Sequence, residues 1–138
     1  MKQLIFAALS LTFVAFLFNK DLPGETAAFV VDVTRCNDTI LDNRAVKVCL
    51  DSVVTDSRCP SDAQCISKGA ATARFTFTVG GQSTTQTLSL KDFEYPGYAN
   101  QFTYNGFQFE FISLEPYPLA SVPQPYSAYK AELRLTRL

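Results

Sequence analysis

The stretch that decides the fold is Ala71–Leu90, which reads ATARFTFTVGGQSTTQTLSL. Its first half, Ala71–Val79, alternates between apolar and polar side chains, which is the pattern of a β-strand that buries one face. Gly80-Gly81 follows, and a glycine pair can adopt the positive φ angles that a tight hairpin turn requires. We therefore expect a strand, a tight turn and a Thr-rich partner strand over Gln82–Leu90.

Further strand-like runs lie on both sides of this hairpin. Phe29–Val33 is a short apolar run that ends at the polar segment Arg35–Asp38, and Ala45–Val54 is rich in β-branched residues. Leu41–Arg44, between those two runs, carries residues typical of turns. A last strand is expected over Tyr126–Leu135.

A second hairpin is marked by Asn105-Gly106, the dipeptide that most strongly indicates a type I′ turn. Aromatic residues flank it with the alternation of strands, at Phe102, Tyr104, Phe107, Phe109 and Phe111. The segment Glu115–Pro125 contains four prolines, and a central strand does not accept so many residues that lack an N–H donor. We expect a loop there.

Together the runs predict an all-β domain with no helical period in its apolar residues. About seven short strands joined by Gly and Pro turns are typical of a single antiparallel β-sandwich, immunoglobulin-like, or of a partly open barrel. The sandwich is the preferred fold class. The 12 Phe and 6 Tyr are expected to fill its core.

Composition excludes several functions. The chain has 138 residues, a formal net charge of −1 and no basic cluster, so we expect no nucleic-acid partner. It contains no histidine, which removes Ser-His-Asp and Cys-His catalysis and the histidine-based zinc sites. The carboxylates that remain, such as Glu94, Glu110 and Glu115, show no spacing that suggests a catalytic pair. We expect no enzyme and no cofactor.

The N-terminus predicts export. Lys2 precedes an apolar run from Leu4 to Phe18, which is typical of a secretory signal peptide and short for a membrane-spanning helix. We expect a signal peptide over residues 1–27, with an uncertain cleavage site, and a sandwich domain over residues 28–138. A retained N-terminal anchor stays open as an alternative. The mature chain is expected in the periplasm or outside the cell, without stable membrane insertion.

Four cysteines suit such a compartment, because structural disulfides persist where the environment is oxidising. Cys59 and Cys65 lie within Asp56–Gly69, which reads DSRCPSDAQCISKG, and can pair without disturbing a strand. Cys36 and Cys49 then remain for each other, and the first two strands can place them side by side. This is one of three possible pairings.

The chain resembles a group of small exported bacterial proteins. The resemblance rests on Asp56–Pro60 with Cys65, a D-S-R-C-P-x-x-x-x-C segment, and on the late P-Y-P loop at Pro116–Pro118. Ser67 and Lys68 depart from the pattern, since Trp and Ala are expected there. The resemblance implies export and a disulfide-bearing β-fold, and it implies no activity.

Four residues are candidates for contact with a partner, an unknown protein or a glycan. The first hypothesis is an exported non-catalytic domain that binds an envelope or extracellular partner through its loops. A protease inhibitor that presents the disulfide-braced loop around Arg58 is an alternative, because a rigid loop lowers the ordering cost of binding. A carbohydrate-binding module is another, since the rings of Tyr95, Tyr98 and Tyr117 could offer flat faces to a sugar.

Two further interpretations concern the acidic residues of the Cys59–Cys65 region. Asp51, Asp56 and Asp62 carry oxygen ligands of the kind that Ca²⁺ prefers, but their spacing matches no known ligand loop, so no metal site is expected. The simpler interpretation is that Asp56 accepts backbone N–H groups and that Arg58 anchors the loop to a neighbouring carboxylate.

Overall fold

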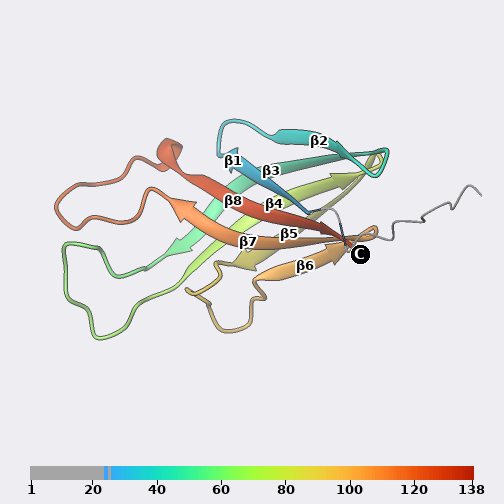
Figure 1. Ribbon diagram of the computed structural model, residues 1–138. Coiled ribbons are helices and arrows are strands. Elements are labelled where there is room, and N and C mark those ends of the chain that lie inside the picture. Colours follow the sequence, from blue (N-terminus) through green and yellow to red (C-terminus); the bar gives the residue numbers. More distant parts are fainter. Residues whose placement is uncertain (1–23, 25) are drawn as a thin grey trace, which may run out of the picture.

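A computed structural model of the protein describes residue 24 and residues 26–138. These residues form two four-stranded antiparallel sheets, with strand orders β1-β8-β7-β6 and β2-β3-β4-β5 (Figure 1). The predicted all-β sandwich is confirmed, and the sheets are not closed into a barrel. The strands are β1 (Thr26–Asp32), β2 (Asn37–Leu41), β3 (Arg44–Asp56), β4 (Ala71–Val79), β5 (Gln82–Ser89), β6 (Gln101–Tyr104), β7 (Phe107–Glu115) and β8 (Lys130–Arg137).

The strands follow one another around the sandwich in sequence order, as they do in an up-and-down barrel. Strands β2 to β5 form one sheet, and β6 to β8 return to the other, where β8 pairs with β1. This order differs from the Greek-key order of immunoglobulin domains. The junctions between β1 and β2 and between β5 and β6 are therefore the two sides on which the strands of the two sheets do not pair.

Phenylalanines fill the core, as the sequence predicted. Phe75 and Phe77 of β4 face Phe109 and Phe111 of β7, and all four side chains are fully buried. The ring centroids of Phe77 and Phe109 are 4.5 Å apart, and those of Phe75 and Phe111 are 5.1 Å apart with an edge-to-face arrangement. These are the distances at which aromatic pairs attract each other beyond their burial.

Most strand bounds agree with the sequence, and the last strand does not. The predicted strand over Tyr126–Leu135 begins too early, because Tyr126–Ala128 forms a short 3₁₀ helix, η1, before β8. The Tyr126 hydroxyl accepts the N–H of Val53 on β3 at 2.9 Å, which fixes this turn against the other sheet.

Strand β2 was not predicted. It pairs with β3 from Asn37 opposite Val48 to Leu41 opposite Arg44. It is a short edge strand with little apolar content, and its Ile40 side chain is 75% exposed. Its conformation therefore depends on pairing with β3 rather than on its own pattern.

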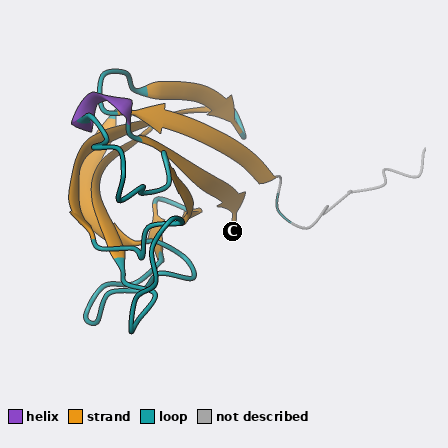
Figure 2. Cartoon of the chain, turned by 90° about the vertical axis from the view of Figure 1, so that its left-hand side faces the viewer, coloured by secondary structure: helices purple, strands orange, loops and turns teal. Residues whose placement is uncertain are grey.

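Three two-residue hairpin turns lie at the end of the sandwich where the chain ends (Figure 1). Both central residues of each turn have positive φ, which confirms the predicted turns at Asp42-Asn43, Gly80-Gly81 and Asn105-Gly106. Arg44 connects two of them, because its Nη1 donates to the carbonyl oxygen of Asn105 at 2.7 Å. The long connections lie at the opposite end, which faces the viewer in Figure 2.

The predicted disulfides are both present, as Cys36–Cys49 and Cys59–Cys65. The first joins residues 13 positions apart and ties the β1–β2 connection to β3. In the chain-entropy model it stabilises the fold by about 3 kcal/mol, and the shorter Cys59–Cys65 loop contributes less. Two disulfides are consistent with an oxidising compartment.

The predicted signal segment lies almost entirely outside the described residues, so its cleavage stays a prediction. Strand β1 begins at Thr26, and Ala27 pairs with Leu135 of β8. The sandwich thus includes two residues before the predicted domain start at Ala28. Within the part of the chain that the structure describes, no helix is long and apolar enough to cross a membrane.

Replacing Gly106 by Val tests the Asn105-Gly106 turn. Gly106 has a φ of +84°, a conformation that a β-branched residue tolerates poorly. We expect a loss of about 1–2 kcal/mol in the free energy of unfolding, measured by urea denaturation. Thr103→Val, at an exposed position of the same hairpin, should leave the midpoint nearly unchanged. Equal midpoints for wild type and Gly106→Val would rule out the turn assignment.

Candidate functional site

Arg58 is a buried arginine just after β3, with 4% of its surface exposed. Its Nε lies 2.8 Å from Oδ1 of Asp56 and its Nη2 lies 2.9 Å from Oδ2, which makes the pair bidentate. Nη1 also donates to the carbonyl oxygen of Leu114 at 2.7 Å, and Nη2 to that of Pro116 at 3.3 Å. The pair therefore ties the chain after β3 to the end of β7.

This geometry overturns the use of Arg58 as a contact residue. An inhibitor loop would have to present the arginine to a protease cleft, whereas this guanidinium has its donors occupied inside the protein. The simpler interpretation is confirmed instead: Asp56 accepts the Arg58 side chain and also the Arg58 backbone N–H at 3.4 Å.

Tyr117 also belongs to this cluster. Its ring centroid lies 4.8 Å from Cζ of Arg58, and the Phe93 ring lies 5.9 Å from the same atom. The Tyr117 and Phe93 rings meet edge to face at 6.1 Å. One side of the half-buried Tyr117 ring thus covers the arginine, and its role in contact with a partner stays a prediction.

The electrostatics of the cluster favour a charged Asp56. Burial by itself would raise the pKa of the Asp56 carboxyl, but the hydrogen bonds and positive charge of Arg58 outweigh it and hold that pKa below its usual value. Tyr129 donates its hydroxyl to Asp56 at 2.9 Å. Burial and this hydrogen bond together raise the pKa of Tyr129 to about 12.

The Cys59–Cys65 loop is exposed, but it is fixed at its base and in its middle. Cys59 donates its N–H to the carbonyl oxygen of Lys68 at 2.9 Å, which extends the pairing of β3 with β4 into the loop. The Asp62 carboxylate accepts the N–H groups of Ala120 and Ser121 at 2.7 and 3.1 Å and the Ser121 hydroxyl at 2.7 Å. Led by the Ser121 hydroxyl, these bonds lower the pKa of Asp62 to about 2.

The three aspartates considered for Ca²⁺ have separate partners. Asp56 binds Arg58, Asp62 binds the 118–122 loop, and Asp51 accepts the Thr76 hydroxyl at 2.7 Å. Among the residues that the structure describes, no three acidic, cysteine or histidine side chains converge on a point where an ion could sit.

Tyr95 and Tyr98, in contrast, are exposed by 43% and 44%. They flank Pro96 and Gly97, and the Tyr98 N–H donates to the Tyr95 carbonyl oxygen at 3.2 Å. Gly97 has a φ of +92°, as the third position of a type II turn requires. The two rings lie 6.0 Å apart and are inclined by 57°.

Buried Ser89, at the end of β5, holds this turn in place. Its Oγ accepts the Tyr95 N–H at 2.6 Å, and its own N–H donates to the Ala99 carbonyl oxygen at 2.8 Å. Asn100 then accepts the N–H of Phe111 on β7 at 2.9 Å. Because the turn is bonded to both sheets, the backbone that carries Tyr98 is held in place.

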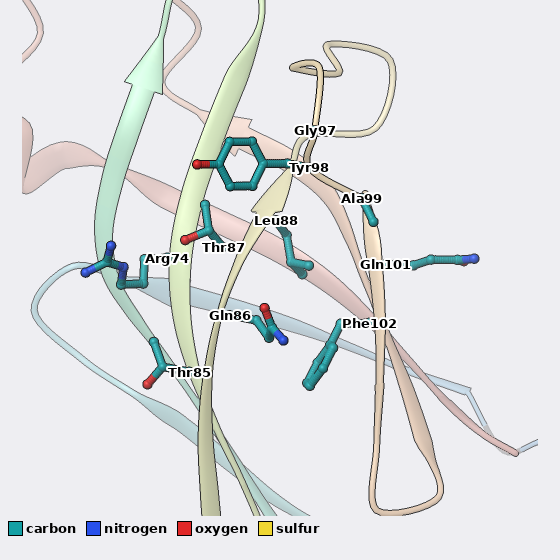
Figure 3. A pocket seen from close by; sticks show the side chains of 10 residues that line it. All are labelled: Arg74, Thr85, Gln86, Thr87, Leu88, Gly97, Tyr98, Ala99, Gln101 and Phe102. Carbon is teal, nitrogen blue, oxygen red and sulfur yellow. The ribbon is translucent and has the colours of Figure 1, made fainter.

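The Tyr98 ring borders an open hollow of about 600 Å³ at the junction of β5 and β6 (Figure 3). Pockets of about 300–1,000 Å³ are typical of small-molecule sites. In Figure 3 the ring extends from its loop over β5, with the hydroxyl pointing toward β4. The hollow is lined by Arg74, Thr85, Gln86, Thr87, Leu88, Gly97, Tyr98, Ala99, Gln101 and Phe102.

The register of β4 and β5 shows how the hollow is built. Arg74 pairs with Thr87 and Thr76 pairs with Thr85, which places Arg74 and the two β5 threonines on the outer face of the sheet. Gln86 pairs with Phe75 of the core and so points to the inner side. The hollow therefore continues around the free edge of β5, from the outer face of its sheet to the gap between the sheets.

Both ends of this free edge are closed by side chains or backbone. At one end Ser89 is bonded to Ala99, and at the other Asn105 donates from Nδ2 to Oε1 of Gln82 at 3.2 Å. The ring centroids of Phe102 on β6 and Phe77 are 5.5 Å apart. Phe102 forms the floor of the hollow between these two closed ends. The hollow is therefore open to solvent at the side of the sandwich and closed near both ends of β5.

Of the sequence-predicted contact residues, only Tyr98 borders the hollow. Arg58 and Tyr117 lie together in the buried cluster, and Tyr95 packs beside Tyr98. Sequence reasoning missed Arg74 and the β5 threonines. The alternation in β4 did mark Arg74 as a residue on the polar face, but nothing local showed that the 97–102 segment would lie beside it.

Comparison of the chain with protein-family models, with characterised proteins and with solved structures found no significant match.

Truncating Arg58 to Ala tests the buried cluster. The change leaves the Asp56 carboxylate buried without its partner, so we expect the free energy of unfolding to fall by about 3–5 kcal/mol, measured by chemical denaturation. Arg134→Ala is the control, because Arg134 pairs with Glu110 at 3.2 Å at an exposed site; it should cost no more than about 1 kcal/mol. Similar losses for both variants would contradict the structural role of Arg58.

A carboxyl titration of Asp62 by NMR tests the tie between the two loops. The pKa of Asp62 is lower in the folded protein than in the unfolded chain. Its hydrogen bonds with Ala120 and Ser121 are therefore intact above about pH 4 and are lost as the pH falls toward 2. We expect a midpoint near pH 2, with the Ala120 and Ser121 amide signals following it. Ser121→Ala should raise the midpoint. An Asp62 midpoint at the ordinary value of 3.8 in the wild type would show that the tie does not form.

Proposed function

We propose that this protein is an exported, non-catalytic β-sandwich domain that binds an envelope or extracellular partner in the hollow between β5 and β6. The observation that carries the proposal is the exposed Tyr98 ring, which borders an open hollow of about 600 Å³ on a turn that the Ser89 and Asn100 hydrogen bonds hold in place. A fixed backbone turn lowers the ordering cost of binding.

Export to the periplasm or the cell exterior is supported by two features. The apolar run after Lys2 is typical of a signal peptide, and the two disulfides suit an oxidising compartment. The resemblance to small exported bacterial proteins points the same way.

Binding through the hollow also agrees better with the structure than an inhibitor role does. The inhibitor hypothesis depended on an exposed Arg58, which is buried. The tyrosine hypothesis depended on accessible rings, and Tyr98 is both accessible and part of a concave surface.

An unbiased binding screen with paired variants tests this function. The purified mature domain is applied to a glycan array and to solubilised envelope and culture-medium fractions, in parallel with Tyr98→Ala and with Ile66→Ala. Ile66 is fully exposed on the Cys59–Cys65 loop, away from the hollow. We expect at least one ligand whose capture is lost in Tyr98→Ala and kept in Ile66→Ala.

Two results would overturn the proposal. One is capture of every ligand equally well by wild type and Tyr98→Ala. The other is capture that depends on Ile66 and not on Tyr98, which would move the binding surface to the Cys59–Cys65 loop. Thermal melting curves of all three proteins establish that the variants are folded.

A further inference from the structure

The free edge of β5 carries backbone groups that face the hollow. Ser89 shows which way they point, because its N–H donates to the Ala99 carbonyl oxygen, away from β4. In an antiparallel pair the N–H and C=O of one residue point to the same side, and the side alternates along the strand. The N–H and C=O groups of Thr85 and Thr87 therefore also point away from β4, into the hollow that both residues line. Among the described residues these four groups have no backbone partner.

This edge lacks the features that usually keep an edge strand from pairing with another chain. Those features are charged side chains, prolines and β-bulges. β5 reads QSTTQTLS, with no charge and no proline. It pairs with β4 from Thr72 opposite Ser89 to Val79 opposite Gln82 without a register shift. The other edge strand of the same sheet, β2, carries the charged Asp38. β5 is therefore a regular, threonine-rich strand whose edge can accept a further strand.

The side chains around the edge direct no charge toward it. The lining of the hollow contains no acidic residue, and its one charged side chain, Arg74, extends toward β3 in Figure 3, away from the edge. Gln101 also points away from β5. Leu88 and Phe102 border the edge on the inner side of the sandwich, and the Tyr98 ring lies over β5. The edge thus offers paired backbone donors and acceptors between apolar side chains.

Resting on the proposed function, we propose that the hollow binds a short extended peptide segment of the partner, uncharged and about five residues long, which adds to β5 as a further antiparallel strand. Alternate residues of the segment form hydrogen-bonded pairs with Thr85 and Thr87. Their side chains lie beside the Tyr98 ring, because residues paired across two strands share a face. The side chains between them point inward to Leu88 and Phe102. A charged group there would lose its hydration and gain no partner, so these inward side chains are apolar.

The closed ends of the edge set the length of the segment. Ser89 is bonded to Ala99 at one end and Gln82 to Asn105 at the other, which leaves residues 83–87 free. Five residues of a strand span about 17 Å. The segment therefore makes its backbone contacts over a stretch of this length and continues outward through the open side of the sandwich.

A second copy of this chain fits the same edge less well. Its own β5 is bordered by its own β6 and 97–102 segment. A two-fold pairing of β5 with β5 would bring these parts of both copies into one hollow, since a two-fold contact uses the same surface on each copy. A single peptide strand has no such neighbours, so the geometry favours the peptide.

Amide hydrogen exchange of the folded mature domain, followed by NMR, tests the strand addition. The probes are end-blocked pentapeptides with threonine at positions 1, 3 and 5 and with valine, leucine, phenylalanine or alanine at positions 2 and 4. We expect at least one probe to slow exchange of the Thr85 and Thr87 amides by about tenfold when about nine-tenths of the domain is bound, because exchange then occurs from the free tenth. The Gln86 amide, which points to β4, is the internal control and should not change.

Changes to the peptide separate strand pairing from side-chain binding. Methylation of the three threonine nitrogens removes the donors that face β5 and should abolish the protection. Methylation of the nitrogens at positions 2 and 4, which point away from β5, should leave it. Glutamate or lysine at positions 2 and 4 should also abolish it, because those side chains point inward.

Matched proline variants test the same contact from the side of the protein. Thr85→Pro removes an outward N–H of β5 and should abolish binding, and an edge strand accepts a proline at such a position. Ile40→Pro is the control: Leu41 and Arg44 close a two-residue turn, so the Ile40 N–H also points outward, on the edge of β2. It should bind the peptide as the wild type does. Melting curves show whether both variants fold, and the methylated peptides decide the question if Thr85→Pro does not.

The outcomes distinguish this inference from the proposed function. The inference is overturned if no probe protects the Thr85 and Thr87 amides, if protection survives methylation of the threonine nitrogens, or if the charged peptides protect equally well. A ligand from the unbiased screen that requires Tyr98 and is still captured by folded Thr85→Pro would leave the hollow as the binding site and exclude strand addition. Loss of that ligand in Thr85→Pro, with capture kept in Ile40→Pro, would support both.

Discussion

The packing of Phe75 and Phe77 against Phe109 and Phe111 sets the geometry on which the candidate site depends. Sheets that face each other across such side chains lie about 10 Å apart, about twice the spacing of hydrogen-bonded strands. β5 and β6 are neighbours in the chain order, yet they are edge strands of opposite sheets and do not pair. The opening between them follows directly from the size of the core side chains.

The two sides of the sandwich on which the sheets do not pair, β1–β2 and β5–β6, are held together by different contacts. Between β1 and β2, the Asn37 side chain donates to the Val30 carbonyl oxygen at 3.1 Å, and the Cys36–Cys49 disulfide holds the connection against β3. Between β5 and β6, Ser89 and Asn105 make contacts only at the two ends of the gap. The first side is held near the β1–β2 connection, and the second is held at its two ends with the hollow between them.

The loop end shows how a polar cluster can determine shape without forming a site. The Asp56–Arg58 pair is buried, and such pairs contribute modest net stability because both charges lose their hydration. Its bonds to the Leu114 and Pro116 carbonyl oxygens nevertheless fix where the connection after β7 begins. Asp62 fixes the middle of the same connection. The long loops are therefore held by specific polar contacts rather than by an apolar core of their own.

Local patterns predicted the parts of the fold that are determined locally. Ala71–Val79 alternates clearly and became β4 with the expected bounds, and the positive φ angles at Asn105-Gly106 follow from the residues themselves. β2 escaped prediction because its neighbour β3, not its own sequence, makes it a strand. The hollow was not predicted because β5 and the 97–102 segment meet only when two edges of different sheets come together.

The same limit explains the misplaced contact residues. Arg58 and Tyr117 were expected to be exposed, because charged and aromatic residues in loops often are. In the structure the Tyr117 ring lies over the Arg58 guanidinium. The aspartate two residues before Arg58 indicated that the two side chains could pair. No local pattern indicated that a loop tyrosine distant in sequence would cover the pair.

The most direct test of the account is an amide chemical-shift map of the isotopically labelled domain as a ligand captured in the binding screen is added. If the hollow is the binding site, the largest changes will fall on Arg74, Thr85, Thr87 and the residues around Tyr98, with little change at the Cys59–Cys65 loop. Changes that cluster on that loop or on the β1–β2 side, or a spectrum that does not change, would contradict the account.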